Sequence, residues 1–308
     1  MAVLFKEVAV WKWLSVVFTT VVMLFLLFRF VSVERLLANF QLLNGYWVFL
    51  GVVAFLFGHL LRYFRYRIMW CWPNSSALAA ATAFHGVISY LLPLRLGEFA
   101  LPFLVKKYSL QSFSKLFFGI IWVRLFDFLV IAIIGLAICL IPSLREQLLD
   151  LMRIPSQSLF HSEVLVPLLA VPLLVALVLI GQFVMYKALD KGSESRRFVF
   201  TTMLIWCSVL LMNGAFAEAV GFRLDIVGLL MLLVLQVLLY FLPLQGLAGL
   251  GAHQLAWVAV LVSQGASPDQ ALSLSIMTHI LVLFSVGILL ILAMILAFRA
   301  SRQRQVPG

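Results

Sequence analysis

Long apolar segments separated by short polar stretches dominate the chain. Six of these segments are close to the about 20 residues that a helix needs to cross the hydrocarbon core of a membrane. We therefore predict spanning helices at about 13–33, 46–61, 115–141, 164–188, 199–220 and 273–298.

Two further apolar regions, residues 76–108 and 226–264, are each interrupted by a short polar break. Proline cannot donate to a helical ladder, and glycine permits tight turns. The residues that define the breaks are Pro93 and Gly97 in the first region, and Pro243, Gly246, Gly249 and Gly251 in the second. In hydrocarbon, non-helical backbone persists only where it is buried in protein or lines a cavity. Each region is therefore predicted to be a re-entrant helical hairpin with its tip at a binding site.

The two broken regions resemble one another in sequence. A Leu-Pro-Leu element opens both breaks, and Glu98 and Arg124 in the first half then correspond to Gln254 and His279 in the second, at spacings of 26 and 25 residues. The first hairpin is predicted to enter the membrane from the cytoplasm and the second from outside, which makes the halves an inverted repeat. One membrane domain, 1–308, would then comprise repeat 1 at about 13–141 and repeat 2 at about 164–298.

Composition places the chain firmly in the membrane class. Hydrophobic residues make up 64% of the 308 residues, charged residues 11%, and the mean hydropathy is +1.13. No soluble domain of this size is so apolar, so an all-α polytopic membrane protein is predicted, with about six spanning helices and two re-entrant hairpins. The three cysteines are scattered singly, without metal or redox spacing.

The net charge of +10 follows membrane topology rather than nucleic-acid binding. Of the 22 basic residues, 15 fall on one predicted side of the helices, which by the positive-inside rule is the cytoplasm and places both termini there. These 15 are Lys6, Lys12, Arg62, Arg65, Arg67, Lys106, Lys107, Lys115, Lys187, Lys191, Arg196, Arg197, Arg299, Arg302 and Arg304.

Arg95 and Glu98 lie at the tip of the first predicted hairpin. A charge at bilayer depth costs about 2.5–3.5 kcal/mol on insertion scales, so each needs a partner or a wet cavity. Their spacing permits an internal ion pair that fixes the hairpin. Alternatively, Arg95 faces a cavity and binds a phosphate through its planar fork, with Glu98 orienting it.

Arg124 and Asp127 occupy i and i+3 positions in the predicted span 115–141. They can neutralise one another. They can also lie near one membrane face, where Arg124 would meet Glu98 or a lipid headgroup. The sequence leaves both interpretations open.

The second break supplies polar groups without a fixed charge, at Gln245, His253 and Gln254. His253 can titrate or donate to a phosphate, or can be a hydrogen-bonded structural histidine. The roles of Glu218 and His279, two further polar residues in apolar surroundings, are left open.

No enzyme motif is present in the sequence: zinc-type histidine or cysteine pairs, phosphate-cradling loops and nucleophile elbows are all missing. We therefore expect neither catalysis nor a cofactor. Two alternatives remain: an integral-membrane glycosyltransferase that uses a polyprenyl-phosphate lipid, and an accessory subunit of a cell-envelope enzyme.

Several elements together resemble the lysylphosphatidylglycerol synthase transmembrane-region family, a bacterial family. They are Pro93-x-Arg95-x-Gly97-Glu98, Arg124-Leu125-Phe126-Asp127, Pro243, Gly249-Leu250-Gly251 and Gly265. Three positions depart from the family pattern: Leu101 replaces a basic residue, Gln254 an acidic residue and His279 an arginine.

The resemblance implies two re-entrant elements and lipid flipping in a bacterial inner membrane. It does not extend to the aminoacyl-transferring domain of fused relatives, so we do not expect lysyl-lipid synthesis. We expect a flippase for an anionic lipid, either a phospholipid or a polyprenyl-phosphate-linked lipid. Its headgroup would be held by Arg95, Glu98, Arg124 and Asp127 from the first half and by Gln245, His253 and Gln254 from the second.

Overall fold

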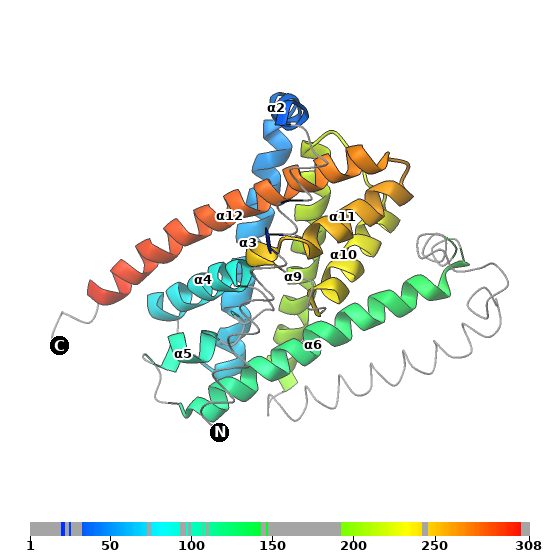
Figure 1. Ribbon diagram of the computed structural model, residues 1–308. Coiled ribbons are helices and arrows are strands. Elements are labelled where there is room, and N and C mark those ends of the chain that lie inside the picture. The colour runs from blue at the N-terminus through cyan, green and yellow to red at the C-terminus, as the bar shows by residue number, and fades with distance from the viewer. Residues whose placement is uncertain are drawn as a thin grey trace, which may run out of the picture.

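The computed structural model describes residues 20, 21, 25, 33–72, 75–92, 97, 100–106, 108, 111–142, 146, 192–241 and 246–302. These residues form helices joined by short connections, with no strand among them (Figure 1). The elements are α2 (Val33–Gln41), α3 (Gly45–Trp70), α4 (Ser76–Leu91), α5 (Ala100–Lys106), α6 (Phe113–Leu140), α9 (Gly192–Ala219), α10 (Ile226–Phe241), η3 (Leu247–Gly249), α11 (Ala252–Ser263) and α12 (Pro268–Arg302).

Four helices are long and apolar enough to cross a membrane: α3, α6, α9 and α12. They coincide with four of the six predicted spans, which confirms the all-helical, multi-pass fold class. The predicted spans 13–33 and 164–188 fall almost entirely outside the described residues. The largest difference in a boundary is at the span predicted to end at residue 61, which continues as a helix to Trp70. Its basic residues therefore lie within α3 rather than in a connecting loop.

Side chains at the helix ends explain where several helices begin. Asn44 accepts hydrogen bonds from the backbone of Tyr46 and Trp47 at the start of α3. Ser75 and Ser112 cap α4 and α6 in the same way. Such caps satisfy backbone N–H groups that have no partner within the helix.

The helices α3 and α9 lie along one another at the centre of the bundle. Two glycines of α3 allow this close approach. A Cβ atom on Gly51 would lie 2.3 Å from the Phe216 ring of α9, and one on Gly58 would lie 2.6 Å from Ser208 Oγ. Small residues at such contacts let membrane helices pack through their backbones.

Gly51→Ala is expected to destabilise the protein by about 1–3 kcal/mol, because the buried Phe216 ring has no room to move and the helices must separate. Gly287→Ala is the matched control, since a Cβ there meets nothing within 4 Å. It should be neutral or stabilising by up to about 1 kcal/mol. Unfolding by SDS titration of purified protein measures both, and equal stability of the two variants would contradict the close α3–α9 contact.

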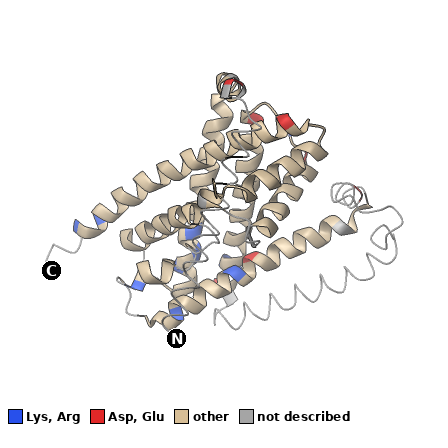
Figure 2. Ribbon diagram, viewed as in Figure 1, with Lys and Arg blue, Asp and Glu red and all other residues tan. Residues whose placement is uncertain are grey.

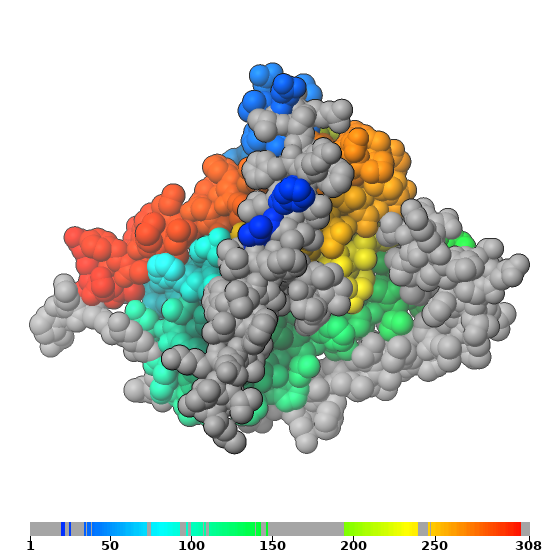
Figure 3. All heavy atoms as spheres, in the orientation of Figure 1, coloured from blue at the N-terminus to red at the C-terminus, as the bar shows by residue number. Residues whose placement is uncertain are grey.

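Each predicted hairpin region is a helix, a break and a second helix. The first is α4 and α5 with buried Gly97 between them, and the second is α10, η3 and α11. The α4 helix of the first half packs on α12 of the second, and α10 of the second half packs on α6 of the first. In each half, the first short helix therefore packs on the last long helix of the other half. Figure 3 shows α4 and α12 side by side on one face of the molecule. The order of long and short helices is the same in both halves, while their inverted orientation in a bilayer stays a prediction.

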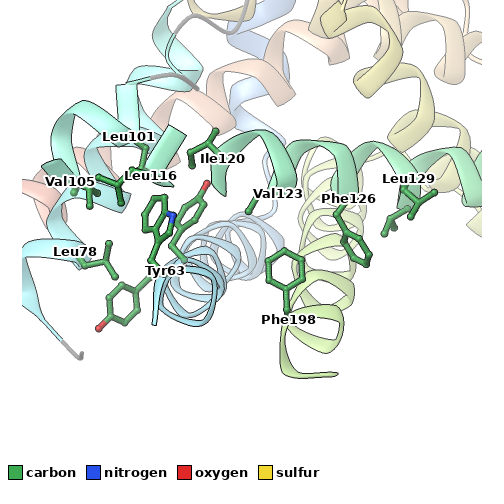
Figure 4. Close-up of a cluster of buried hydrophobic side chains, with 14 residues drawn as sticks. Tyr63, Leu78, Leu101, Val105, Leu116, Ile120, Val123, Phe126, Leu129 and Phe198 are labelled. Carbon is green, nitrogen blue, oxygen red and sulfur yellow. The ribbon is translucent and has the colours of Figure 1, made fainter. Parts of the chain in front are cut away.

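A cluster of buried apolar side chains joins the first hairpin region to the long helices (Figure 4). Leu101 and Val105 of α5 pack with Leu116 and Ile120 of α6, and Phe198 of α9 closes the other end of the cluster. Within a membrane such contacts stabilise through van der Waals packing rather than through removal of apolar surface from water. This packing holds α5 against α6 and thereby fixes one side of the break.

Charged residues are separated along the bundle. Figure 2 shows Lys and Arg toward the end of the bundle where α5, the start of α6 and the end of α12 lie, and several acidic residues around α2 and the start of α12, with a further acidic residue within α6. This separation agrees with the predicted positive-inside pattern. The acidic residue within α6 is Asp127, which belongs to the site described next.

Candidate functional site

A cavity of about 200 Å³ lies at the centre of the bundle, where the two halves meet. Its walls come from α3, α4, α6, α9, α10, η3, α11 and α12, and it has room for several water molecules or a small polar group. The polar residues that line it are His59, Arg62, His85, Ser89, Tyr90, Arg124, Asp127, Gln236, His253 and His279.

Asp127 is the centre of a buried ion-pair network. Its carboxylate accepts two hydrogen bonds from the Arg65 fork, at 2.5 Å from Nη1 and 3.1 Å from Nη2. Arg124 Nη1 donates to the same carboxylate at 3.3 Å, so the i,i+3 pair predicted from the sequence is present. The principal partner was missed, because the span was expected to end before Arg65. With only 1% of its side chain exposed, Arg65 is committed to Asp127 and is not available to a ligand.

Arg62 lies one turn before Arg65 on α3 and faces the cavity. Among the described residues, no carboxylate is within ion-pair distance of its guanidinium. Arg62 is half-buried, and a cation withdrawn from bulk water without a partner is costly, so such a group normally meets an anion or ordered water. Arg62 is therefore the strongest anion-binding candidate in the cavity, and sequence reasoning had assigned it only a topological role.

Histidines converge on the same cavity. Four of the five histidines of the chain line it: His59, His85, His253 and His279. They come from four different helices, and the rings of His253 and His279 are only 4.6 Å apart between centroids. Neither ring nitrogen of His59 has a hydrogen-bond partner in the described part of the chain. Since buried polar groups are normally hydrogen-bonded, these nitrogens are directed to water or a ligand.

The second break is held by a chain of hydrogen bonds. The Gly251 N–H donates to Gln254 Oε1 at 2.8 Å, and Gln254 Nε2 donates to His279 Nδ1 at 2.9 Å. His279 Nε2 in turn donates to the Ala248 carbonyl at 3.0 Å. Ala248 and Gly249 both have positive φ angles, 55° and 78°. The network stabilises this turn, and it places Gln254 behind the cavity wall rather than in it.

The predicted site residues fall into three groups. Arg124, Asp127, His253 and Gly249 line the cavity, as does His279, whose role had been left open. Glu218 lies 3.7 Å from Arg223 and is not part of the cavity wall. The residues that fall outside the described part of the chain are Pro93, Arg95, Glu98, Pro243 and Gln245.

The glycines of the breaks make close backbone contacts. A Cβ on Gly97 would lie 2.5 Å from the Ile88 carbonyl oxygen, so the first break passes directly against the last turn of α4. Gly246 donates its N–H to the Leu250 carbonyl at 2.8 Å and is buried. Gly251, with φ of 93°, adopts a backbone conformation that few other residues tolerate.

Only the tertiary structure identifies the other cavity residues. Arg62, His59 and His85 carry no sequence motif, and the available signal was that His59 and His85 are polar residues within predicted apolar segments. Gln236 of α10 accepts a hydrogen bond from Asn213 of α9 at 3.1 Å, which fixes its position in the wall. No three His, Cys, Asp or Glu side chains among the described residues are arranged to hold a metal ion.

Together these features define a multi-pass helical membrane protein with a central cationic cavity at broken helices. The family model for the lysylphosphatidylglycerol synthase TM region matches residues 12–290, and the chain belongs to this family. No curated protein and no solved structure matched the chain. The family relates the protein to membrane proteins of lipid synthesis and flipping, as the resemblance of its motifs had implied.

Proposed function

We propose that the protein transports an anionic lipid across the membrane by sheltering its headgroup in the central cavity. The observation that carries the proposal is Arg62, a cavity-lining guanidinium without an acidic partner among the described residues. Arg124 lines the same space and shares Asp127 with Arg65. A planar guanidinium can bind a phosphate with two parallel hydrogen bonds, which favours phosphate over an uncharged headgroup.

The broken helices provide the route for a polar group. Ala248 and Gly249 of the second break line the cavity. Breaks of this kind are tolerated where they line a cavity, and they commonly mark transporter sites near the membrane midplane. A cavity of about 200 Å³ has room for a phosphate-bearing headgroup, and the lipid tails would remain in the bilayer. Arg95 and Glu98 of the first break and Gln245 of the second are proposed to bind the same headgroup.

A transferase is less well supported. A transferase of the kind considered above would need a carboxylate base that is free to accept a proton, whereas the Asp127 carboxylate already accepts hydrogen bonds from Arg65 and Arg124. We therefore propose a transporter rather than an enzyme. It would act in a bacterial inner membrane with both termini cytoplasmic, and a cell-envelope biosynthetic enzyme is the partner class that would consume the translocated lipid.

The test is transbilayer movement in liposomes that contain the purified protein. Fluorescent phosphatidylglycerol, phosphatidylcholine and a prenyl phosphate are compared, each against protein-free liposomes. We expect the two anionic lipids to move at least about tenfold faster than the zwitterionic one, equivalent to about 1.4 kcal/mol of headgroup discrimination. An Arg95→Ala variant should lose part of this acceleration. If every lipid crosses the bilayer at the same rate with and without protein, the proposal is wrong.

A further inference from the structure

We infer that the cavity binds a proton together with the anionic headgroup, and that His59 and His253 accept this proton. The inference rests on the proposed transport function and supplies its coupling ion. Imidazole is the side chain whose charge changes between about pH 5 and pH 8. Four of the chain's five histidines line this one cavity.

The hydrogen bonds show which histidines can take a proton. Thr278 Oγ1 donates to the Ser275 carbonyl at 3.0 Å, so it accepts from His253 Nε2 at 3.2 Å. This leaves Nδ1 of His253 without a hydrogen-bond partner among the described residues. His59 has both ring nitrogens without partners there. Each ring therefore has a nitrogen that is not hydrogen-bonded to a described residue, and both residues line the cavity.

His279 is excluded as the acceptor by its own contacts. Its Nε2 already donates to Ala248, so a second proton would have to bind at Nδ1. There it would face the Nε2 donor of Gln254. Turning the Gln254 amide would not relieve the conflict, because its oxygen accepts from the Gly251 N–H. His279 thus keeps the second break in place in its neutral form.

Electrostatics couples the proton to the anion. Without a ligand, protonation of His59 or His253 adds a positive charge to a cavity that already contains guanidinium groups, which is unfavourable. A phosphate in the cavity offsets part of this positive field and thereby favours the imidazolium. The anion and the proton therefore promote each other's binding, and reciprocity requires that the effects be equal.

Every charged or titratable group at the cavity enters this balance. The described residues of α9, α10 and η3 contribute only neutral side chains to its wall. The groups from the other helices are His59, Arg62 and, behind the wall, Arg65 from α3; His85 and Tyr90 from α4; Arg124 and Asp127 from α6; His253 from α11; and His279 from α12.

The experiment measures binding of short-chain phosphatidylglycerol to the full-length protein in detergent between about pH 8 and about pH 6. This phosphodiester keeps one negative charge across the range, so any pH dependence comes from the protein. We expect affinity to increase as the pH falls, with an upper limit of about tenfold per pH unit for each proton taken up. A pH dye in weakly buffered solution should report proton uptake on mixing.

Two variants assign the acceptors. His253→Gln and His59→Gln should each flatten the pH dependence, and both should reduce proton uptake. Tyr90→Phe changes the same cavity without removing an imidazole and should retain the wild-type slope. Thermal unfolding of each variant identifies misfolding, and two independent histidines keep the test decisive if one variant fails to fold.

The outcomes separate the inference from the function on which it rests. One outcome would overturn proton coupling and leave the lipid-transport function intact. In it, binding and transport depend on Arg62 but not on pH, and no proton is taken up. Absence of both binding and transport of every anionic lipid at all pH values would overturn the transport function and the inference with it. A pH slope that persists in both histidine variants would assign the proton elsewhere and contradict the inference.

Discussion

Asp127→Leu is expected to lower the free energy of unfolding by about 3–5 kcal/mol, the largest stability effect that the structure predicts. The substitution leaves Arg65 buried without its carboxylate, and an uncompensated buried charge costs far more than the pair contributes. Arg124 loses the same partner but is less affected, because 29% of its side chain is exposed. Unfolding by SDS titration, or the thermal midpoint in detergent, measures the loss.

A double substitution distinguishes this mechanism from simple loss of packing. Arg65→Met combined with Asp127→Leu removes both charges and fills the space with apolar side chains, and such replacements are often neutral or stabilising. The double variant should therefore recover most of the stability lost in Asp127→Leu. If it is as unstable as Asp127→Leu, the orphaned guanidinium is not the cause of the destabilisation.

Arg62→Gln is expected to reduce binding and transport of anionic lipid by at least about 30-fold while leaving the fold intact. Removing one partner of a desolvated, hydrogen-bonded charge pair costs about 2–5 kcal/mol, which corresponds to this loss or more. Stability should change little, because Arg62 leaves no described carboxylate behind. Lipid binding and liposome transport are measured together with the thermal midpoint.

Arg67→Gln is the matched control, since Arg67 lies on the same helix but outside the central cavity. It removes the same charge and should leave headgroup affinity within about twofold, a difference of about 0.4 kcal/mol. Arg62→Lys keeps the charge without the planar fork and should restore only part of the binding. Equal losses for Arg62→Gln and Arg67→Gln would show that the overall positive charge, rather than a specific site, attracts the lipid.

The helical membrane fold was predictable because it depends on local composition. In hydrocarbon every backbone group must be satisfied within the helix, so a long apolar segment specifies a span without reference to its neighbours. The breaks were predictable for the same reason, since proline and glycine change the backbone where they stand. The end of α3 was not predictable in this way. Arg62 and Arg65 are typical of charges at a membrane interface, and only the structure shows that α3 continues through them and that Arg65 is buried.

The candidate site was predicted only in part. Arg124 and Asp127 could be paired from sequence because i,i+3 residues of one helix are neighbours. Gln254 and His279 had been aligned with Glu98 and Arg124, and their contact at 2.9 Å shows that this pair of positions meets in the second half. That Arg62 belongs to the candidate site could not be inferred from the sequence, because its role depends on which carboxylates lie near it in space.

The sequence by itself determined the class of protein, its breaks and its family, all of which follow from the order of apolar and polar residues along the chain. The tertiary structure decided how the charges are shared. Asp127 could pair with several arginines, and the packing of α3 against the rest of the bundle selects Arg65, 62 residues away in sequence, as its bidentate partner. That choice leaves Arg62 facing the cavity. Likewise, four histidines far apart in the chain line one space only because the two halves interlock.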